Sequence, residues 1–175
     1  MQATLTDYFY VQLRQSVRVV LPLLCTKEVI LLQRGEICPI PGIAPALRGV
    51  VNQRGRMLWV LDLSDLLKLP PSPTGLRSWS SMHDSLTSVV IAGLTTDKTA
   101  PASTPLSISC VVATLQGVVS LNPETFKPVP ARISPALKGF FTGVVEIEHL
   151  PVAVLNVNAI FKSVGAYGNT PLPSC

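Results

Sequence analysis

The sequence predicts an all-β protein made of two small, packed β-barrels with short helical turns, and three observations support this. Short aliphatic runs follow one another along the chain, and none has a long helical period. Sixteen prolines and eleven glycines punctuate these runs, which suits barrels or sandwiches better than stacked helices. One stretch of sequence also occurs twice. The composition, with 47% hydrophobic and 14% charged residues, excludes a disordered chain.

The predicted strands begin close to the amino terminus. Residues 8–13 and 17–24 form a hairpin, because two apolar runs flank the polar residues 14–16. Further aliphatic and β-branched runs predict strands at 56–63, 88–94, 108–115, 117–121, 139–145 and 151–157. Short helical turns are expected at 64–68 and 158–162.

The repeated stretch indicates an internal duplication. Pro-Ala-Leu-Arg-Gly at 45–49 recurs as Pro-Ala-Leu-Lys-Gly at 135–139, an offset of 90 residues. The same offset aligns Val29 with Val119, Leu31 with Leu121 and Ile43 with Ile133. Farther along, 61–68 aligns with 155–162 at an offset of 94. Four extra residues are therefore expected around 146–149, at a hairpin tip.

Each copy predicts a barrel of about five strands, of the SH3-like type. Such a barrel is too small for a large core of its own, so the two should share one within a single domain covering 1–175. The expected boundaries are about 14–86 for the first subunit and 87–160 for the second. Exchange of the N-terminal strand, 7–13, between the barrels stays open. Polar stretches at about 70–87 and 95–105 are expected to be surface loops.

The length of the apolar runs and the residues at the amino terminus predict where in the cell the protein is located. None approaches the ~18 residues that a membrane helix needs, because Arg18 and Pro22 interrupt the first and Glu146 interrupts the last. The amino terminus lacks the basic start and apolar stretch of a secretory signal. We therefore expect a cytoplasmic protein without direct membrane insertion. The cysteines are far apart, as is typical of reduced thiols: Cys25, Cys38, Cys110 and Cys175.

No catalytic or cofactor motif is present in the sequence. It has no nucleophile elbow, phosphate-binding loop, dinucleotide-binding turn or zinc-protease helix. The stretch 80–84 contains serine, His83 and aspartate, but in a segment that resembles a loop rather than a rigid frame. Glu146, Glu148 and His149 fall at the expected hairpin tip, which favours a solvated turn over a metal site. We therefore predict a non-catalytic protein with no cofactor and no metal.

A series of short motifs runs in order from residue 8 to residue 69. The motifs are Leu21-Pro22, Glu28-Val29, Ile40-Pro41-Gly42, Arg48-Gly49-Val50, Asn52-Gln53-Arg54-Gly55 and Leu61-Asp62-Leu63. In order and spacing they resemble the CheW family, the adaptors that join chemoreceptors to the chemotaxis histidine kinase. The segments 138–139 and 155–157 resemble that family's second barrel, so the likeness covers nearly the whole chain. Gln53, where leucine is usual, and the long loop at 95–105 leave chemotaxis, pilus motility and phototaxis open.

The predicted binding residues centre on one turn. Asn52 and Gly55 have the chemistry of a tight hairpin connection, since both tolerate positive φ. Arg54 on that turn is well placed for bidentate contact with a partner carboxylate. The resemblance implies that Arg54 contacts the receptor and that Glu28 lies close to it across the sheet. Two further residues, Val29 and Arg48, complete the predicted partner-binding set, and Arg48 and its echo Lys138 are expected to be exposed.

Three residues are predicted to be structural. Asp62 interrupts an apolar strand, and a buried carboxylate without partners is costly. We expect it to accept backbone N–H groups at the start of the 64–68 turn. Gly49 and Gly139 follow a basic residue at the same point of each copy and are expected at turns.

The resemblance implies a non-catalytic signalling scaffold with two surfaces. One surface would bind the regulatory domain of a histidine kinase and the other the cytoplasmic tip of a chemoreceptor. The protein would be a monomer until it is recruited to a receptor array at the membrane.

The alternative function is binding of single-stranded nucleic acid by a small β-barrel. The net charge is +4, but the 14 basic residues are dispersed and the 6% aromatic residues do not alternate with them. Nucleic acid is therefore not an expected partner, and salt-dependent retention on a nucleic-acid column would discriminate the two functions.

Overall fold

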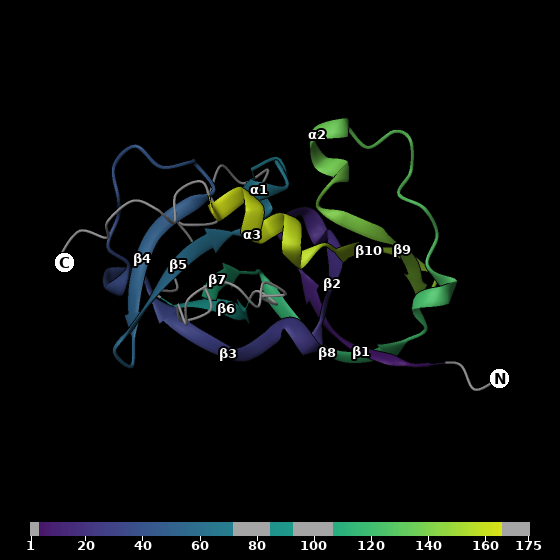
Figure 1. Ribbon diagram of the computed structural model, residues 1–175, viewed down its shortest axis with the longest axis horizontal. Helices are drawn as coiled ribbons and strands as arrows, with labels where there is room; N and C mark the ends of the chain where they lie inside the picture. Colours follow the sequence, from purple (N-terminus) through teal and green to yellow (C-terminus); the bar gives the residue numbers. More distant parts are fainter. Residues whose placement is uncertain (1–3, 72–84, 93–106, 166–175) are drawn as a thin grey trace, which may run out of the picture.

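The computed structural model describes residues 4–71, 85–92 and 107–165, and it confirms an all-β fold. One five-stranded sheet has the order β3 (Thr26–Gln33), β6 (Ser85–Ala92), β7 (Ser107–Val111), β5 (Arg56–Asp62) and β4 (Leu47–Gln53). The other has the order β8 (Thr114–Leu121), β1 (Thr6–Gln12), β2 (Arg18–Pro22), β10 (Leu150–Leu155) and β9 (Phe141–Ile147). Figure 1 shows the first sheet on the left and the second on the right.

The helical segments between these strands are short. The α-helices are α1 (Leu63–Leu66), α2 (Pro135–Lys138) and α3 (Val157–Gly165). The 3₁₀ turns are η1 (Arg14–Ser16), η2 (Leu23–Cys25), η3 (Arg34–Glu36) and η4 (Pro123–Thr125). The predicted turns at 64–68 and 158–162 correspond to α1 and α3. Helix α3 is longer than predicted because Val157, Ile160 and Val164 recur at helical spacing and bury one face of it.

The two sheets repeat one pattern of strand pairing. Read in spatial order, each strand of the first sheet has a counterpart in the second: β3 and β8, β6 and β1, β7 and β2, β5 and β10, β4 and β9. The registers agree as well, since Trp59 pairs with Val50 and Ile108. Its counterpart Ala153 pairs with Val144 and Val19. The predicted duplication is therefore visible strand by strand.

The N-terminal hairpin completes the second sheet. Strand β1 pairs with β8, and β2 pairs in parallel with β10. Strands β6 and β7 fill the same positions in the first sheet. The observed division therefore differs from the boundary expected near residue 86. Its physical reason is that β8, β9 and β10 alone would leave unpaired edges where the hairpin now binds.

The four extra residues of the second copy do not lie at the hairpin tip. Both hairpins have two-residue loops, and all four residues have positive φ: Arg54, Gly55, Glu148 and His149 at 52°, 80°, 51° and 62°. Such loops match the twist of the flanking strands, so an insertion is poorly tolerated there. The insertion expected at 146–149 is therefore wrong. The additional residues lie before β9, next to α2.

One apolar cluster joins the two sheets. It contains Val11 and Val19 of the second sheet, Leu61 and Ile108 of the first, and Ile160 of α3, each no more than 1% exposed. Smaller clusters fill the interior of each sheet. The two halves are therefore packed against each other around a shared core, with α3 crossing the middle of the molecule (Figure 1).

Three of the four cysteines lie in the described residues. Cys25 and Cys110 are free, whereas Cys38 is disulfide-bonded, so the expectation of reduced thiols is wrong at Cys38. Burial raises the pKa of the Cys110 and Cys25 thiols.

Within the described ranges, no helix is both long and apolar enough to cross a membrane.

Candidate functional site

The turn between β4 and β5 presents Arg54 to solvent. Gln53 pairs with Arg56, which leaves Arg54 and Gly55 as a two-residue loop. The Asn52 Oδ1 atom accepts a hydrogen bond from the Gly55 N–H at 2.9 Å. This bond and the positive φ values give the tight connection that asparagine and glycine favour. The Arg54 side chain is exposed, and the turn between β4 and β5 that carries it lies at the lower left of Figure 1.

Glu28 does not pair with Arg54. Its Oε1 atom lies 3.8 Å from Nη2 of Arg56, the neighbour of the turn on β5. Glu28 shares a face of β3 with the buried Ile30, and Arg56 shares a face of β5 with the buried Leu58. The ion pair therefore lies at one end of the small core of the first sheet. Arg56 is about half exposed, so the pair should contribute only about 0–1 kcal/mol.

The opposite face of β3 carries an apolar stripe. Val29 is 37% and Leu31 68% exposed, whereas Ile30 and Leu32, which alternate with them, are buried. This alternation is that of a half-buried strand, and β3 is an edge strand of its sheet. Glu28 precedes Val29 of the stripe in the chain and contacts Arg56, which follows the Arg54 turn. We call Glu28, Val29, Leu31, Arg54 and Arg56 the β3–turn surface.

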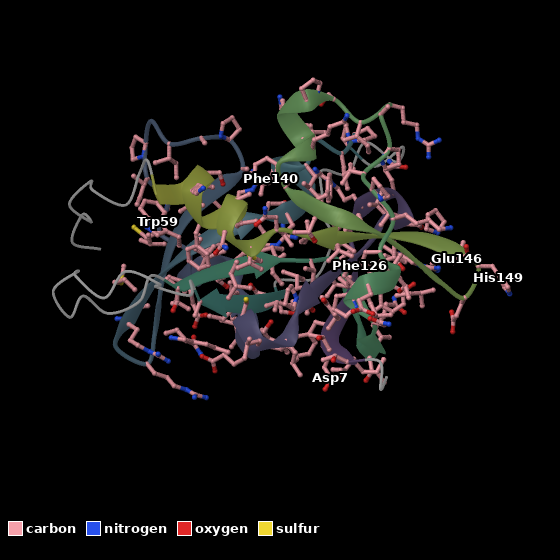
Figure 2. The ribbon with its side chains drawn as sticks, turned by 45° about the vertical axis from the view of Figure 1, so that its right-hand side comes forward. Asp7, Trp59, Phe126, Phe140, Glu146 and His149 are labelled. Atoms are coloured by element: carbon pink, nitrogen blue, oxygen red, sulfur yellow. The ribbon has the colours of Figure 1, made fainter. Side chains whose placement is uncertain are left out.

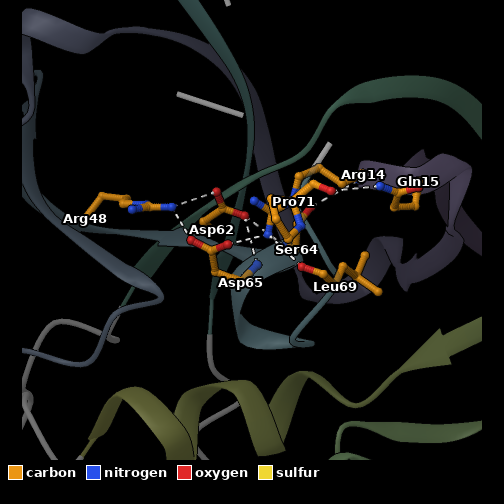
Figure 3. Close-up of polar contacts among 8 residues, drawn as sticks. All are labelled: Arg14, Gln15, Arg48, Asp62, Ser64, Asp65, Leu69 and Pro71. Atoms are coloured by element: carbon orange, nitrogen blue, oxygen red, sulfur yellow. Dashed lines mark hydrogen bonds and ion pairs between the residues drawn. The ribbon is translucent and has the colours of Figure 1, made fainter. Parts of the chain in front are cut away.

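Arg48 lies in an ion cluster instead of at an exposed binding surface. Its Nη2 atom lies 3.4 Å from Oδ2 of Asp62 and also pairs with Asp65 (Figure 3). Arg14 of η1 pairs with Asp65 from the other side and donates to the Leu69 carbonyl at 3.3 Å. The expectation of an exposed Arg48 is wrong, since its side chain is 27% exposed. The cluster therefore connects the N-terminal hairpin, which belongs to the second sheet, to α1, the helix that directly follows β5 of the first sheet.

Asp62 is the N-cap of α1. Its Oδ1 atom accepts hydrogen bonds from the backbone N–H groups of Ser64 at 2.9 Å and Asp65 at 3.2 Å. Its counterpart Asn156 accepts from the Ala159 N–H at 3.2 Å at the start of α3. The cap that the apolar context of Asp62 predicts is therefore present, and it occurs in both halves of the molecule.

Gly139 does not match Gly49 in the structure. Gly139 ends α2 with φ −62°, and nothing lies within 4 Å of where a Cβ would be. The counterpart of Gly49 is Gly143, because Val50 and Val144, which follow these glycines, form equivalent bridges to residues 38 and 127. A residue with a side chain could adopt this conformation, so the structure does not require the glycine that was expected to be structural here.

The described residues considered for metal binding are solvated. His149 Nδ1 lies 3.4 Å from Glu146 Oε1 at the exposed end of the β9–β10 hairpin (Figure 2). His83 and its neighbours lie outside the described residues. In the part that is described, no three potential metal ligands gather. Tyr8 and Tyr10 are buried in the second sheet, so they form no stacking platform for bases.

The comparisons with known proteins identify a family and a fold. Residues 7–165 match the family described as the CheW-like domain. The structure is similar to the crystal structure of the scaffolding protein TtCheW from Thermoanaerobacter tengcongensis, with a TM-score of 0.67 and 14% sequence identity. The likeness covers 87% of this chain and 90% of that chain. No curated protein matches the sequence.

Proposed function

Because the chain belongs to the CheW-like domain family, we propose that it is a non-catalytic scaffold that couples a chemoreceptor to a chemotaxis-type histidine kinase. The observation that carries this proposal is the β3–turn surface, which combines an exposed arginine on a tight turn with an exposed apolar stripe on β3. Such a combination suits two protein contacts of different chemistry. The protein acts in the cytoplasm, as a monomer until it joins receptor clusters at the membrane.

The receptor contact is assigned to Arg54. A guanidinium makes two parallel hydrogen bonds to a carboxylate, and arginine is frequent among the residues that dominate binding energy. The Asn52 bond to Gly55 holds the turn, so little backbone entropy is lost on binding. Arg54 therefore binds a carboxylate of the receptor's cytoplasmic tip.

The kinase contact is assigned to Val29 and Leu31. Their exposed side chains lie on an edge strand, where a second barrel can pack. The regulatory domain of the kinase supplies that barrel. Charge reversal at Arg54 and loss of the apolar stripe should therefore have separate effects.

A binding experiment with two variants tests both assignments. Arg54→Glu should weaken capture of receptor cytoplasmic fragments about tenfold or more and leave kinase capture unchanged. Leu31→Asp should do the reverse, because it places a charge in an apolar contact. Both are measured by pull-down and biolayer interferometry against the receptors and kinases of the source organism.

The control is Glu148→Arg at the equivalent turn of the second sheet. Glu148 adopts φ 51° where Arg54 adopts 52°, so a glutamate at 54 fits the turn and the fold should be retained. Circular dichroism checks this. If the wild-type protein captures neither partner, the proposal fails and only the fold is shared with the family. If Arg54→Glu behaves as Glu148→Arg does, the receptor binds elsewhere.

A further inference from the structure

A groove of about 510 Å³ lies on the second sheet, away from the β3–turn surface. Its walls come from β2, β9, β10 and the segment before α2. Most of the lining side chains are apolar, among them Val17, Ile133, Val144, Leu150 and Ala153. In Figure 1 these strands lie on the right, and the Arg54 turn lies on the left.

At the corresponding place the first sheet carries a buried indole. Trp59 occupies the position in β5 that Ala153 occupies in β10, with Val50 and Val144 as equivalent cross-strand neighbours. Trp59 is 5% exposed and lies in one apolar cluster with Ile43, which aligns with Ile133 of the groove. Figure 2 shows Trp59 at the end of the molecule opposite the β9–β10 hairpin. The second sheet thus has Val144 and Ile133 at the positions of Val50 and Ile43, and an alanine at the position of the tryptophan.

The rim of the groove is cationic. Arg18 and Arg132 line it, and no aspartate or glutamate does. Among the described residues neither arginine is in an ion pair. The nearest carboxylate by strand register, that of Glu146 opposite Pro151, contacts His149 at 3.4 Å. An occupant with carboxylates beside its apolar group would therefore find two guanidinium groups available.

We propose that this groove binds an acidic segment of another protein, which inserts one large aromatic side chain beside Ala153 while its carboxylates contact Arg18 and Arg132. The position of Trp59 in the first sheet is the template for the inserted ring. A buried aromatic side chain removes about 150–250 Å² from water, and aromatic and arginine residues dominate protein interfaces. This interaction surface goes beyond the proposed function, and either can fail without the other.

A labelled peptide serves as the probe. Fluorescein-Glu-Glu-Ser-Trp-Ser-Glu-Glu-amide should bind the wild-type protein saturably, with a Kd on the order of 10–100 µM by fluorescence anisotropy. Replacing its tryptophan with alanine, or its glutamates with lysines, should weaken binding about tenfold or more.

Two variants locate the peptide. Ala153→Trp fills the groove as Trp59 fills the first sheet, so binding should fall about tenfold or more. Arg132→Glu, at an exposed position, should weaken binding about tenfold and carries the test if Ala153→Trp does not fold. Lys162→Glu, at an exposed position of α3 outside the groove, is the matched control and should bind the peptide as the wild type does.

Three results would overturn the proposal. The wild type fails to bind the peptide, or both groove variants bind it as tightly as the wild type. In the third, sedimentation shows a dimer of the wild type that Ala153→Trp dissociates, so the occupant is a second copy of the chain.

Discussion

Gly49→Ala is expected to lower the free energy of unfolding by about 3–4 kcal/mol, from backbone strain and lost hydrogen bonds together. Gly49 has φ +136°, which side chains on L-residues rarely adopt. An added Cβ would overlap the carbonyl oxygen of Cys38 and lie 2.9 Å from Cα of Pro39. That backbone cannot move away cheaply, because Cys38 and Val50 exchange two hydrogen bonds of 2.8 and 2.9 Å.

Two glycines provide matched controls for this substitution. Gly55→Ala retains a positive φ of 80° but meets nothing within 4 Å, so about 1 kcal/mol should be lost. Gly143→Ala brings its Cβ to 3.0 Å from the Lys127 carbonyl oxygen, and an intermediate loss of about 1–2 kcal/mol follows. Urea denaturation measures all three. A loss for Gly49→Ala no greater than that for Gly55→Ala would show that the close approach to Cys38 is unimportant.

Asp62→Ala is expected to cost about 2–4 kcal/mol. The carboxylate is 2% exposed and accepts from Ser64 and Asp65. Its removal leaves these N–H groups without that acceptor and takes one carboxylate away from Arg48. The unsatisfied buried groups account for most of the loss, which is measured by urea denaturation.

Asp62→Asn separates the cap from the charge. Asn156 shows that an asparagine can cap the helix at the equivalent position. The amide oxygen of an asparagine at 62 should therefore retain the cap, so the loss should be only about 1 kcal/mol. Equal losses for the two variants would mean that the ion pair with Arg48, rather than the cap, is what Asp62 contributes.

The sequence predicts the features that depend on local chemistry. The turn at 52–55 and the cap at Asp62 each follow from side chains and backbone within a few residues of one another. The repeat extends this to the architecture, because aligned segments such as 61–68 and 155–162, each the end of a strand followed by a helix, occupy equivalent places.

Features that depend on which distant strands pair could not be predicted from alternation alone. The two-residue period gives the buried face of a strand but not its neighbour. The exchange of strand 7–13 therefore stayed open, and the pairing of β2 with β10 and the contact of Glu28 with Arg56 were missed. The position of the insertion had a signal, since Gly-Val-Val at 49–51 recurs at 143–145, an offset of 94. The longer match at 45–49 obscured it. The groove could not be predicted from the sequence, because only the strand register shows that Ala153 is the equivalent of Trp59 in the repeat.

The coupling of receptor to kinase is tested most directly by kinase autophosphorylation in a reconstituted array. With receptor, kinase and the wild-type protein present, a receptor ligand should change the rate about fivefold or more. With Arg54→Glu in its place, the kinase should bind the protein normally but not respond to the receptor. A receptor response that is equally large without the protein, or with Arg54→Glu, would contradict the account.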